Sequence, residues 1–235
     1  MISASMEDYL KAIYELEDEA GSRVKTSSIA DHLGVTSPTV TSGMEKLEDR
    51  SLIDRKKYEG VRLTEKGRKV ALETVRHHRL LETFLSEYLD YSWTDVHDEA
   101  DVLEHHISEE FERKVASALD DPEVDPHGDP IPTESLDPVT EETSQTLSDS
   151  SEGETVVVER VSDRDEEKLR YLSDAGIVPG TVVRVVEVAP IGMVVVEVED
   201  ESEQSLPEEI AERIYVSNAD KMGGAESETS QHGTT

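Results

Sequence analysis

Residues 96–111 read Val-His-Asp-Glu-Ala-Asp-Val-Leu-Glu-His-His-Ile-Ser-Glu-Glu-Phe, and their spacing guides the interpretation of the whole chain. Apolar residues recur at steps of three and four, which predicts one amphipathic helix continuing to about residue 119. These apolar residues are Val96, Ala100, Leu103, Ile107 and Phe111. A polar strip with the same spacing follows on the neighbouring face: His97, Asp101, Glu104, His105 and Ser108. Its imidazoles and carboxylates suit a divalent first-row metal ion. The alternative is a solvated acidic face, which an acidic composition produces easily.

A second helix is predicted over residues 65–89, with a seam that faces the interior of the protein. The seam positions are Ala71, Val75, His78, Glu82, Leu85 and Leu89. Burying an unpaired carboxylate is unfavourable, so Glu82 needs a partner. That partner is either His78, one turn away, or a metal ion shared with the strip at residues 97–105. The strip on the next helix favours the shared metal ion.

The composition is strongly acidic, but the charge is unevenly distributed. The 235 residues, enough for two or three small domains, include 55 Asp and Glu against 23 Lys and Arg, a net charge of −32. Residues 1–70 contain 12 basic and 13 acidic residues, a net charge of −1, which leaves −31 for the rest. A near-neutral segment in such a chain is where a polyanion could bind. The acidic excess suggests the hypothesis of a halophilic protein in a salt-rich cytoplasm.

The chain has no cysteine, which excludes disulfides and thiolate metal sites. We find no basic-then-apolar signal pattern and no apolar run of membrane-spanning length. We therefore expect a cytoplasmic protein.

The first 70 residues predict a winged helix-turn-helix. A first helix is expected from Ser5, as its cap, to about Glu19, with Asp8 roughly opposite the inward-facing Leu10 and Ile13. A short helix opening at residue 27 and ending at residue 34 precedes a third helix, which residue 36 or 37 caps. Two short helices joined by a tight turn form a DNA-binding helix-turn-helix motif, called the reading head below. On the third helix we expect DNA contacts from Ser37, Pro38, Thr39, Thr41, Ser42 and Lys46.

Residues 52–63 then predict a β-hairpin, or wing, with a turn at 58–60. Four basic residues on it suit phosphate contacts: Arg55, Lys56, Lys57 and Arg62. A wing used for protein contacts is the alternative. The concentration of basic residues in so acidic a chain favours DNA.

The second half of the chain changes character. Residues 121–154 contain five of the nine prolines, which indicates a linker. Valine-rich runs at 155–161, 181–188 and 193–198, a shorter run at 213–216 and a helix at 165–175 predict a small SH3-type β-barrel. The fold class is therefore mainly α with a small β domain.

Several short strings occur in an order that resembles the diphtheria-toxin-repressor family of metal-dependent transcription regulators. They lie at residues 6–14, 37–40, 63–67, 78–82, 96–100, 104–106 and 126–132, and the resemblance covers about residues 3–135. The C-terminal part resembles the SH3-like/FeoA-like domain of the longer members. The implied domains are a winged helix-turn-helix DNA-binding domain at 1–72, a helical metal-binding and dimerisation domain at 73–135, a flexible linker at 136–154, the SH3-like/FeoA-like domain at 155–220 and a disordered tail at 221–235.

The resemblance implies a homodimer that binds double-stranded operator DNA and a divalent metal ion. The residues matching the primary metal site are Asp8, Asp101, Glu104 and His105, and those matching the ancillary site are His78, Glu82 and His97. The iron-responsive branch has Met and Cys at positions 8 and 101, whereas the manganese-responsive branch has carboxylates there, as this chain does. That branch also has Glu at position 11, where this chain has Lys11. The resemblance thus implies Mn²⁺ or Fe²⁺. Lys11 departs from its pattern, and because an ammonium group beside a cation is unfavourable, we expect the paired manganese centre to be lost.

The expected function is repression of metal-uptake and metal-homeostasis genes, with no enzymatic activity. Metal would hold the two reading heads of the dimer one helical turn of DNA apart. One alternative is a metal-independent winged-helix regulator that senses an organic ligand. Another is a metallohydrolase with a DNA-binding domain, although we find no separate nucleophile or phosphate-binding loop.

Overall fold

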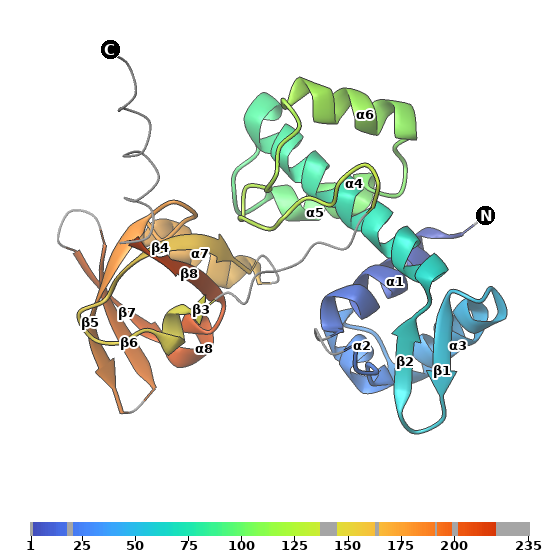
Figure 1. Ribbon diagram of the computed structural model, residues 1–235, viewed down its shortest axis with the longest axis horizontal. Coiled ribbons are helices and arrows are strands. Elements are labelled where there is room, and N and C mark those ends of the chain that lie inside the picture. The colour runs from blue at the N-terminus through green and yellow to red at the C-terminus, as the bar shows by residue number, and fades with distance from the viewer. Residues whose placement is uncertain are drawn as a thin grey trace, which may run out of the picture. The chain divides into compact units, whose positions relative to one another are not determined.

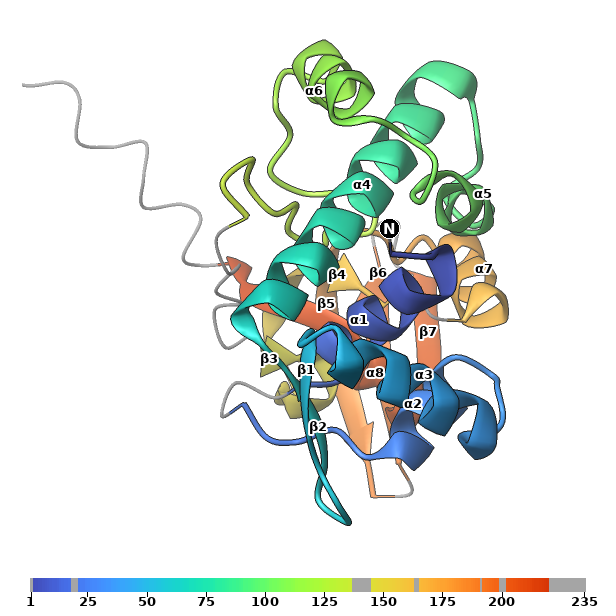
Figure 2. The same ribbon diagram turned by 90° about the vertical axis from the view of Figure 1, so that its right-hand side faces the viewer.

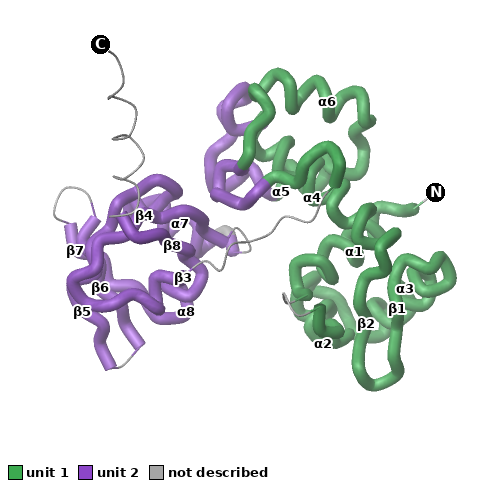
Figure 3. Tube along the Cα trace, in the orientation of Figure 1, with its two compact units in different colours: residues 1–84, 98–123, 131–139 green, residues 85–97, 124–130, 140–235 purple. Residues whose placement is uncertain are grey.

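A computed structural model describes residues 2–17, 21–136, 145–162, 165–190, 192–198 and 202–219. The chain forms two compact units (Figure 3). The first contains residues 1–84, 98–123 and 131–139, and the second contains residues 85–97, 124–130 and 140–235. The predicted tail at 221–235, and residues 137–144 of the predicted linker, lie outside the described residues.

The first unit begins with the predicted winged helix (Figure 1). Its elements are α1 (Ala4–Leu16), α2 (Thr26–His32), α3 (Ser37–Asp49), β1 (Ile53–Lys56) and β2 (Gly60–Leu63). Strands β1 and β2 pair antiparallel from Ile53 opposite Leu63 to Lys56 opposite Gly60. The three helices and the hairpin enclose one apolar core, which includes Leu10, Ile13, Ile29, Met44, Leu47 and Leu52.

Helix α1 is shorter than expected. It starts after Ser3 rather than Ser5 and ends at Leu16, before Glu17. The Glu17 carboxylate accepts a hydrogen bond from the Leu63 amide at 2.8 Å and pairs with Arg68. These contacts to β2 and to the helix that begins at Glu65 explain why the helical pattern stops there.

Helix α4 (Glu65–Leu89) matches the prediction, but the helix expected over residues 96–111 is wrong. The structure has α5 (Val96–Leu103) and a separate α6 (Glu109–Ala118). Ser108 caps α6 by accepting a hydrogen bond from the Phe111 amide at 3.3 Å, and the acidic first turn favours a new helix start. As a consequence, Phe111 is 43% exposed instead of facing inward.

The second unit is built on a six-stranded antiparallel sheet in the order β3-β8-β4-β5-β6-β7. Its elements are β3 (Gln145–Thr146), η1 (Leu147–Asp149), β4 (Thr155–Val161), α7 (Glu166–Asp174), β5 (Val182–Ala189), β6 (Met193–Val198), β7 (Ser202–Pro207), α8 (Glu208–Ala211) and β8 (Ile214–Asn218). Alternate valines of β4, β5 and β6 are buried in its core. The outer strands β3 and β7 do not pair with each other, so the expected barrel is not closed among the described strands.

Residues 145–149, predicted to belong to the linker, are part of this sheet unit as β3 and η1. Strand β7 was not predicted either. Its sequence, Ser-Glu-Gln-Ser-Leu-Pro, contains few of the β-branched and aromatic residues that mark strands.

The loop at 124–130, part of the string that resembles the repressor family, packs within the second unit. Trp93 Nε1 donates to the Pro126 carbonyl at 2.8 Å, and Arg160 Nη1 is 3.0 Å from Asp129 Oδ1. Gly128 has φ +88°, and a Cβ there would lie 2.0 Å from the Glu159 carbonyl oxygen, so only glycine fits.

Among the residues that the structure describes, no helix combines the length and the apolar composition needed to cross a membrane.

Candidate metal centre and DNA interface

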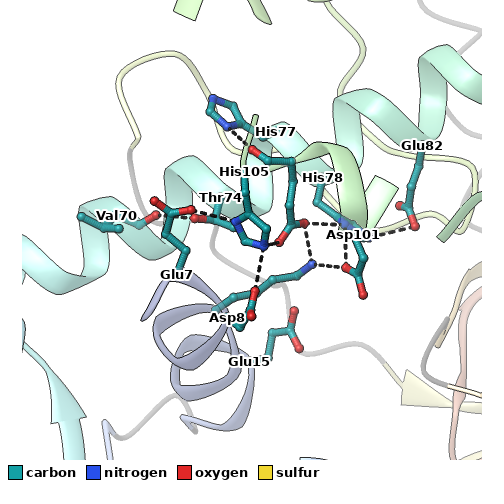
Figure 4. A network of polar contacts seen from close by, with 12 residues as sticks. Glu7, Asp8, Glu15, Val70, Thr74, His77, His78, Glu82, Asp101 and His105 are labelled. Atoms are coloured by element: carbon teal, nitrogen blue, oxygen red, sulfur yellow. Dashed lines mark hydrogen bonds and ion pairs between the residues drawn. The ribbon is translucent and has the colours of Figure 1, made fainter. Parts of the chain in front are cut away.

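Three of the predicted primary ligands meet in the first unit (Figure 4). Asp8 projects from α1, and Glu104 and His105 lie in the turn that follows α5. His105 Nε2 is 2.8 Å from Asp8 Oδ1 and 3.4 Å from Glu104 Oε1. One donor atom from each residue can be chosen so that all lie within 4.8 Å of one another. The prediction that Asp8 faces away from the core of its own domain is confirmed, because its side chain is directed to His105.

The charges in this group fit a cation. The Glu104 side chain is buried. Burial raises the pKa of Asp8, the neighbouring His105 lowers it, and the Glu104 carboxylate raises it. Two carboxylates and one imidazole make an oxygen-rich donor set suited to Mn²⁺ or Fe²⁺. The residues present therefore fit a divalent first-row ion.

Lys11 occupies the other side of Glu104. Its Nζ lies 2.8 Å from Glu104 Oε2 and 3.0 Å from Asp101 Oδ1. Burial by itself lowers the pKa of Lys11, but the carboxylates of Glu104 and Asp101 outweigh it and raise the pKa above the usual range. Asp101, the fourth predicted primary ligand, is thus engaged by an ammonium group, and it is also 3.2 Å from His78 Nδ1.

The predicted ancillary ligands His78 and Glu82 are buried, as their seam positions indicated. His78 Nε2 is 3.0 Å from Glu82 Oε1, and Nδ1 is 2.7 Å from Glu104 Oε2. Burial lowers the pKa of His78, but the Glu82 carboxylate and hydrogen bonds to Asp101 and Glu104 raise it well above its usual value. His97, half-buried on α5, belongs to the second unit. Their role as metal ligands stays a prediction.

Glu7 is a residue of this centre that sequence reasoning missed. Its Oε2 lies 2.7 Å from His105 Nδ1, the ring nitrogen that does not face Asp8 (Figure 4). A carboxylate on the second nitrogen of a ligating histidine orients the ring and raises its basicity. Neighbouring residues on a helix point about 100° apart, so the sequence did not show that Glu7 and Asp8 both reach His105.

The recognition surface on α3 is largely as predicted. Ser37, Pro38, Thr39, Ser42 and Lys46 are exposed. Thr41 differs, because it is half-buried and its hydroxyl donates to the Ser37 carbonyl at 2.9 Å. Their contact with DNA stays a prediction.

Three of the four predicted wing cations are already paired with carboxylates. Arg55 pairs with Glu45 at 3.9 Å, Lys56 with Glu59 at 3.4 Å and Arg62 with Asp54 at 3.0 Å. Within the described part of the chain, Lys57 alone among the four makes no ion pair. Exposed pairs of this kind are weak, so they can exchange for phosphate.

A winged-helix head, a helical region with a carboxylate–histidine cluster and a small β unit together define the class of metal-dependent winged-helix regulators. Comparison with known proteins specifies the family. Residues 1–61 match the N-terminal DNA-binding domain of the iron-dependent repressors, residues 64–133 their metal-binding and dimerisation domain, and residues 145–218 the FeoA domain. This chain belongs to the iron-dependent repressor family, which includes the diphtheria toxin repressor.

Individual relatives agree with this assignment. The iron-dependent repressor IdeR of Mycobacterium tuberculosis (strain H37Rv) is 32% identical over 221 residues, covering 89% of this chain and 95% of that protein. The diphtheria toxin repressor of Corynebacterium glutamicum is 33% identical over 189 residues, covering 77% and 82%. A solved manganese-dependent transcriptional repressor in complex with manganese is 36% identical, with a TM-score of 0.83 over 91% of this chain and 99% of the other. The sequence-based resemblance and fold class are confirmed.

Proposed function

We propose that this protein is a cytoplasmic transcriptional repressor that binds operator DNA as a homodimer when it holds Mn²⁺ or Fe²⁺. It controls genes of metal uptake and homeostasis. The observation that carries the proposal is the cluster of Asp8, Glu104 and His105, because it joins the first helix of the DNA-binding head to the turn after α5. The metallohydrolase alternative is not favoured, since the matching relatives are repressors.

The first helix is also linked to the recognition helix. The Tyr9 hydroxyl of α1 donates to the Thr39 carbonyl of α3 at 3.5 Å. A Cβ at Gly43 would lie 2.3 Å from the Tyr9 ring, so glycine lets the two helices approach closely. A change in the position of α1 therefore moves the surface that reads DNA.

Asp8, Glu104 and His105 would hold the metal ion, and Glu7 would orient His105. When bound, the ion supplies positive charge that is shared by two carboxylates from separate elements. This attraction fixes α1 against the turn at residues 104–106. Because Tyr9 of α1 contacts α3, the position of α3 is then fixed as well. The oxygen-rich donor set suits Mn²⁺, while Fe²⁺ accepts the same ligands.

The test follows operator binding in a gel-shift assay while Mn²⁺ and Fe²⁺ are titrated separately. We expect wild-type protein to retain the operator only with metal, and His105→Ala to lose this response at any metal concentration below a millimolar. His106→Ala is the matched control, because His106 is exposed and makes none of the cluster's contacts. Glu7→Ala should lower metal affinity by about 10- to 100-fold, whereas Glu7→Gln, which keeps a hydrogen-bond acceptor, should lose less.

Operator binding by wild-type protein without metal would support the metal-independent alternative. A normal metal response in His105→Ala would overturn the site assignment. A response to Fe²⁺ but not Mn²⁺ at equal free concentrations would overturn the argument from oxygen ligands.

A further inference from the structure

The tip of the wing carries an aromatic side chain that the fold does not use. Tyr58 lies in the turn between β1 and β2, and it is 93% exposed. Its φ is +70°, in the left-handed region that bulky residues rarely adopt. Strained residues of this kind concentrate at functional sites.

The hairpin is anchored directly beside its turn, so the direction of the tip is defined. Val24 and Val61 exchange both backbone hydrogen bonds, at 2.7 and 2.9 Å. Gly60 has φ +110°, and a Cβ there would lie 2.3 Å from the Val24 carbonyl oxygen. The turn therefore projects from a short three-stranded arrangement.

The wing also lies beside the recognition helix. Arg55 of β1 pairs with Glu45 of α3 at 3.9 Å. Figure 2 shows the hairpin extending beyond α2 and α3 at that end of the unit. When the start of α3 enters the major groove, an adjacent projection is placed to reach the backbone and minor groove that flank it.

We propose that Tyr58 is a DNA contact, packing its ring against the sugars that line the minor groove beside the base pairs read by α3. Lys57 Nζ lies 5.0 Å from the centre of the Tyr58 ring, which places a cation next to that contact. The ring is uncharged, so its contact with DNA sugars releases no counterions and does not weaken with salt as contacts between cations and phosphates do. This inference rests on the proposed DNA-binding function and adds a residue to it.

The test measures operator affinity of the metal-loaded full chain by fluorescence anisotropy over a series of salt concentrations. Tyr58→Asn removes the ring but tolerates the positive φ, and Tyr58→Phe keeps the ring. We expect Tyr58→Asn to weaken binding by about ten-fold, the order seen when an aromatic contact to nucleic acid is removed. Its salt slope should match that of the wild type, whereas Lys57→Ala should reduce the slope by about one. Tyr58→Phe should bind like the wild type.

Thermal unfolding without DNA separates a DNA contact from a structural role. Tyr58→Asn should unfold at the same temperature as the wild type or higher, because strain is relieved. A lower unfolding temperature, or unchanged operator affinity, would overturn the proposal. Failure of wild-type protein to bind operator with metal would instead overturn the proposed function.

Discussion

Lys11 places an ammonium group between two carboxylates that the resemblance assigns to metal binding. It lies within 3.0 Å of both Asp101 and Glu104, and its side chain is only 13% exposed. A fixed positive charge at this position takes the place that a second cation would need. The structure thus gives a physical basis for the expectation that the paired manganese centre is lost.

Changing Lys11 to Glu should create that second site. The new carboxylate would join Asp101 and Glu104, so the three would repel one another until a cation is bound. We expect calorimetric titration to show one more Mn²⁺ per protomer than the wild type binds. We also expect the Lys11→Glu variant to unfold at a lower temperature than the wild type without metal and to be stabilised by added Mn²⁺.

The matched control is Lys11→Gln, which removes the cation without adding a ligand charge. It should bind no additional Mn²⁺. Unchanged stoichiometry in Lys11→Glu, together with an unfolding temperature insensitive to Mn²⁺, would show that Lys11 does not exclude a second ion.

At the scale of elements, the break between α5 and α6 determines the geometry of the centre. Glu104 and His105 follow the last residue of α5, and Ser108 caps α6, which begins at Glu109. In the single helix that we expected, residues 104 and 105 would point about 100° apart. In the turn, Glu104 and His105 both reach Asp8 or its neighbours on α1, as the distances above show.

The start of α4 is joined to the wing through a close backbone approach. A Cβ at Gly67 would lie 1.9 Å from the Leu52 carbonyl oxygen, and the Thr64 hydroxyl donates to the same oxygen at 3.0 Å. We expect Gly67→Ala to push α4 away from the hairpin. The free energy of unfolding should fall by about 1–3 kcal/mol, as for other overpacked sites.

Chemical denaturation measures this loss, and Lys69→Ala, an exposed change on the same helix, is the control. Gly67→Ala should also weaken operator binding, because the wing moves with respect to α4. Full stability in Gly67→Ala would show that the helix start adjusts without cost.

At the scale of the whole molecule, charge is the dominant property. The net charge of −32 opposes compaction, and salt screens this repulsion. Raising KCl from 0.1 M to 2 M should therefore raise the midpoint of thermal unfolding by on the order of 5 °C. Circular dichroism across a KCl series measures the midpoint.

Operator affinity should respond to salt with the opposite sign. Each phosphate contact releases counterions, so affinity falls as salt rises. Measuring the unfolding midpoint and the operator affinity in the same KCl series separates two effects of salt. One is the self-repulsion of the acidic residues after position 70, and the other is DNA binding by the near-neutral residues 1–70. An unfolding midpoint that stays constant or falls with KCl would contradict the role of self-repulsion.

The elements whose identity depends on local spacing could be predicted from the sequence. The winged helix follows from short apolar patterns punctuated by caps and turns, and the valine strands of the second unit follow from their composition. Burial of His78 and Glu82 was also predictable, because seam positions on a long helix repeat regularly. The family resemblance supplied the set of predicted metal ligands, but the sequence did not show how these residues are arranged in space.

The tertiary structure decided which charged groups meet. Lys11 and Asp101 are 90 residues apart, and Glu7 and His105 are 98 residues apart, so no local pattern relates them. The sequence by itself determined a winged-helix head, a helical region with a carboxylate and histidine set, and a valine-rich β unit. Only the packing of α1 against the turn after α5 decided that His105 lies between Glu7 and Asp8 and that Lys11 engages Asp101 and Glu104. The physical reason is that side-chain periodicity specifies the face of each element, whereas pairing of charges depends on contacts between elements distant in the chain.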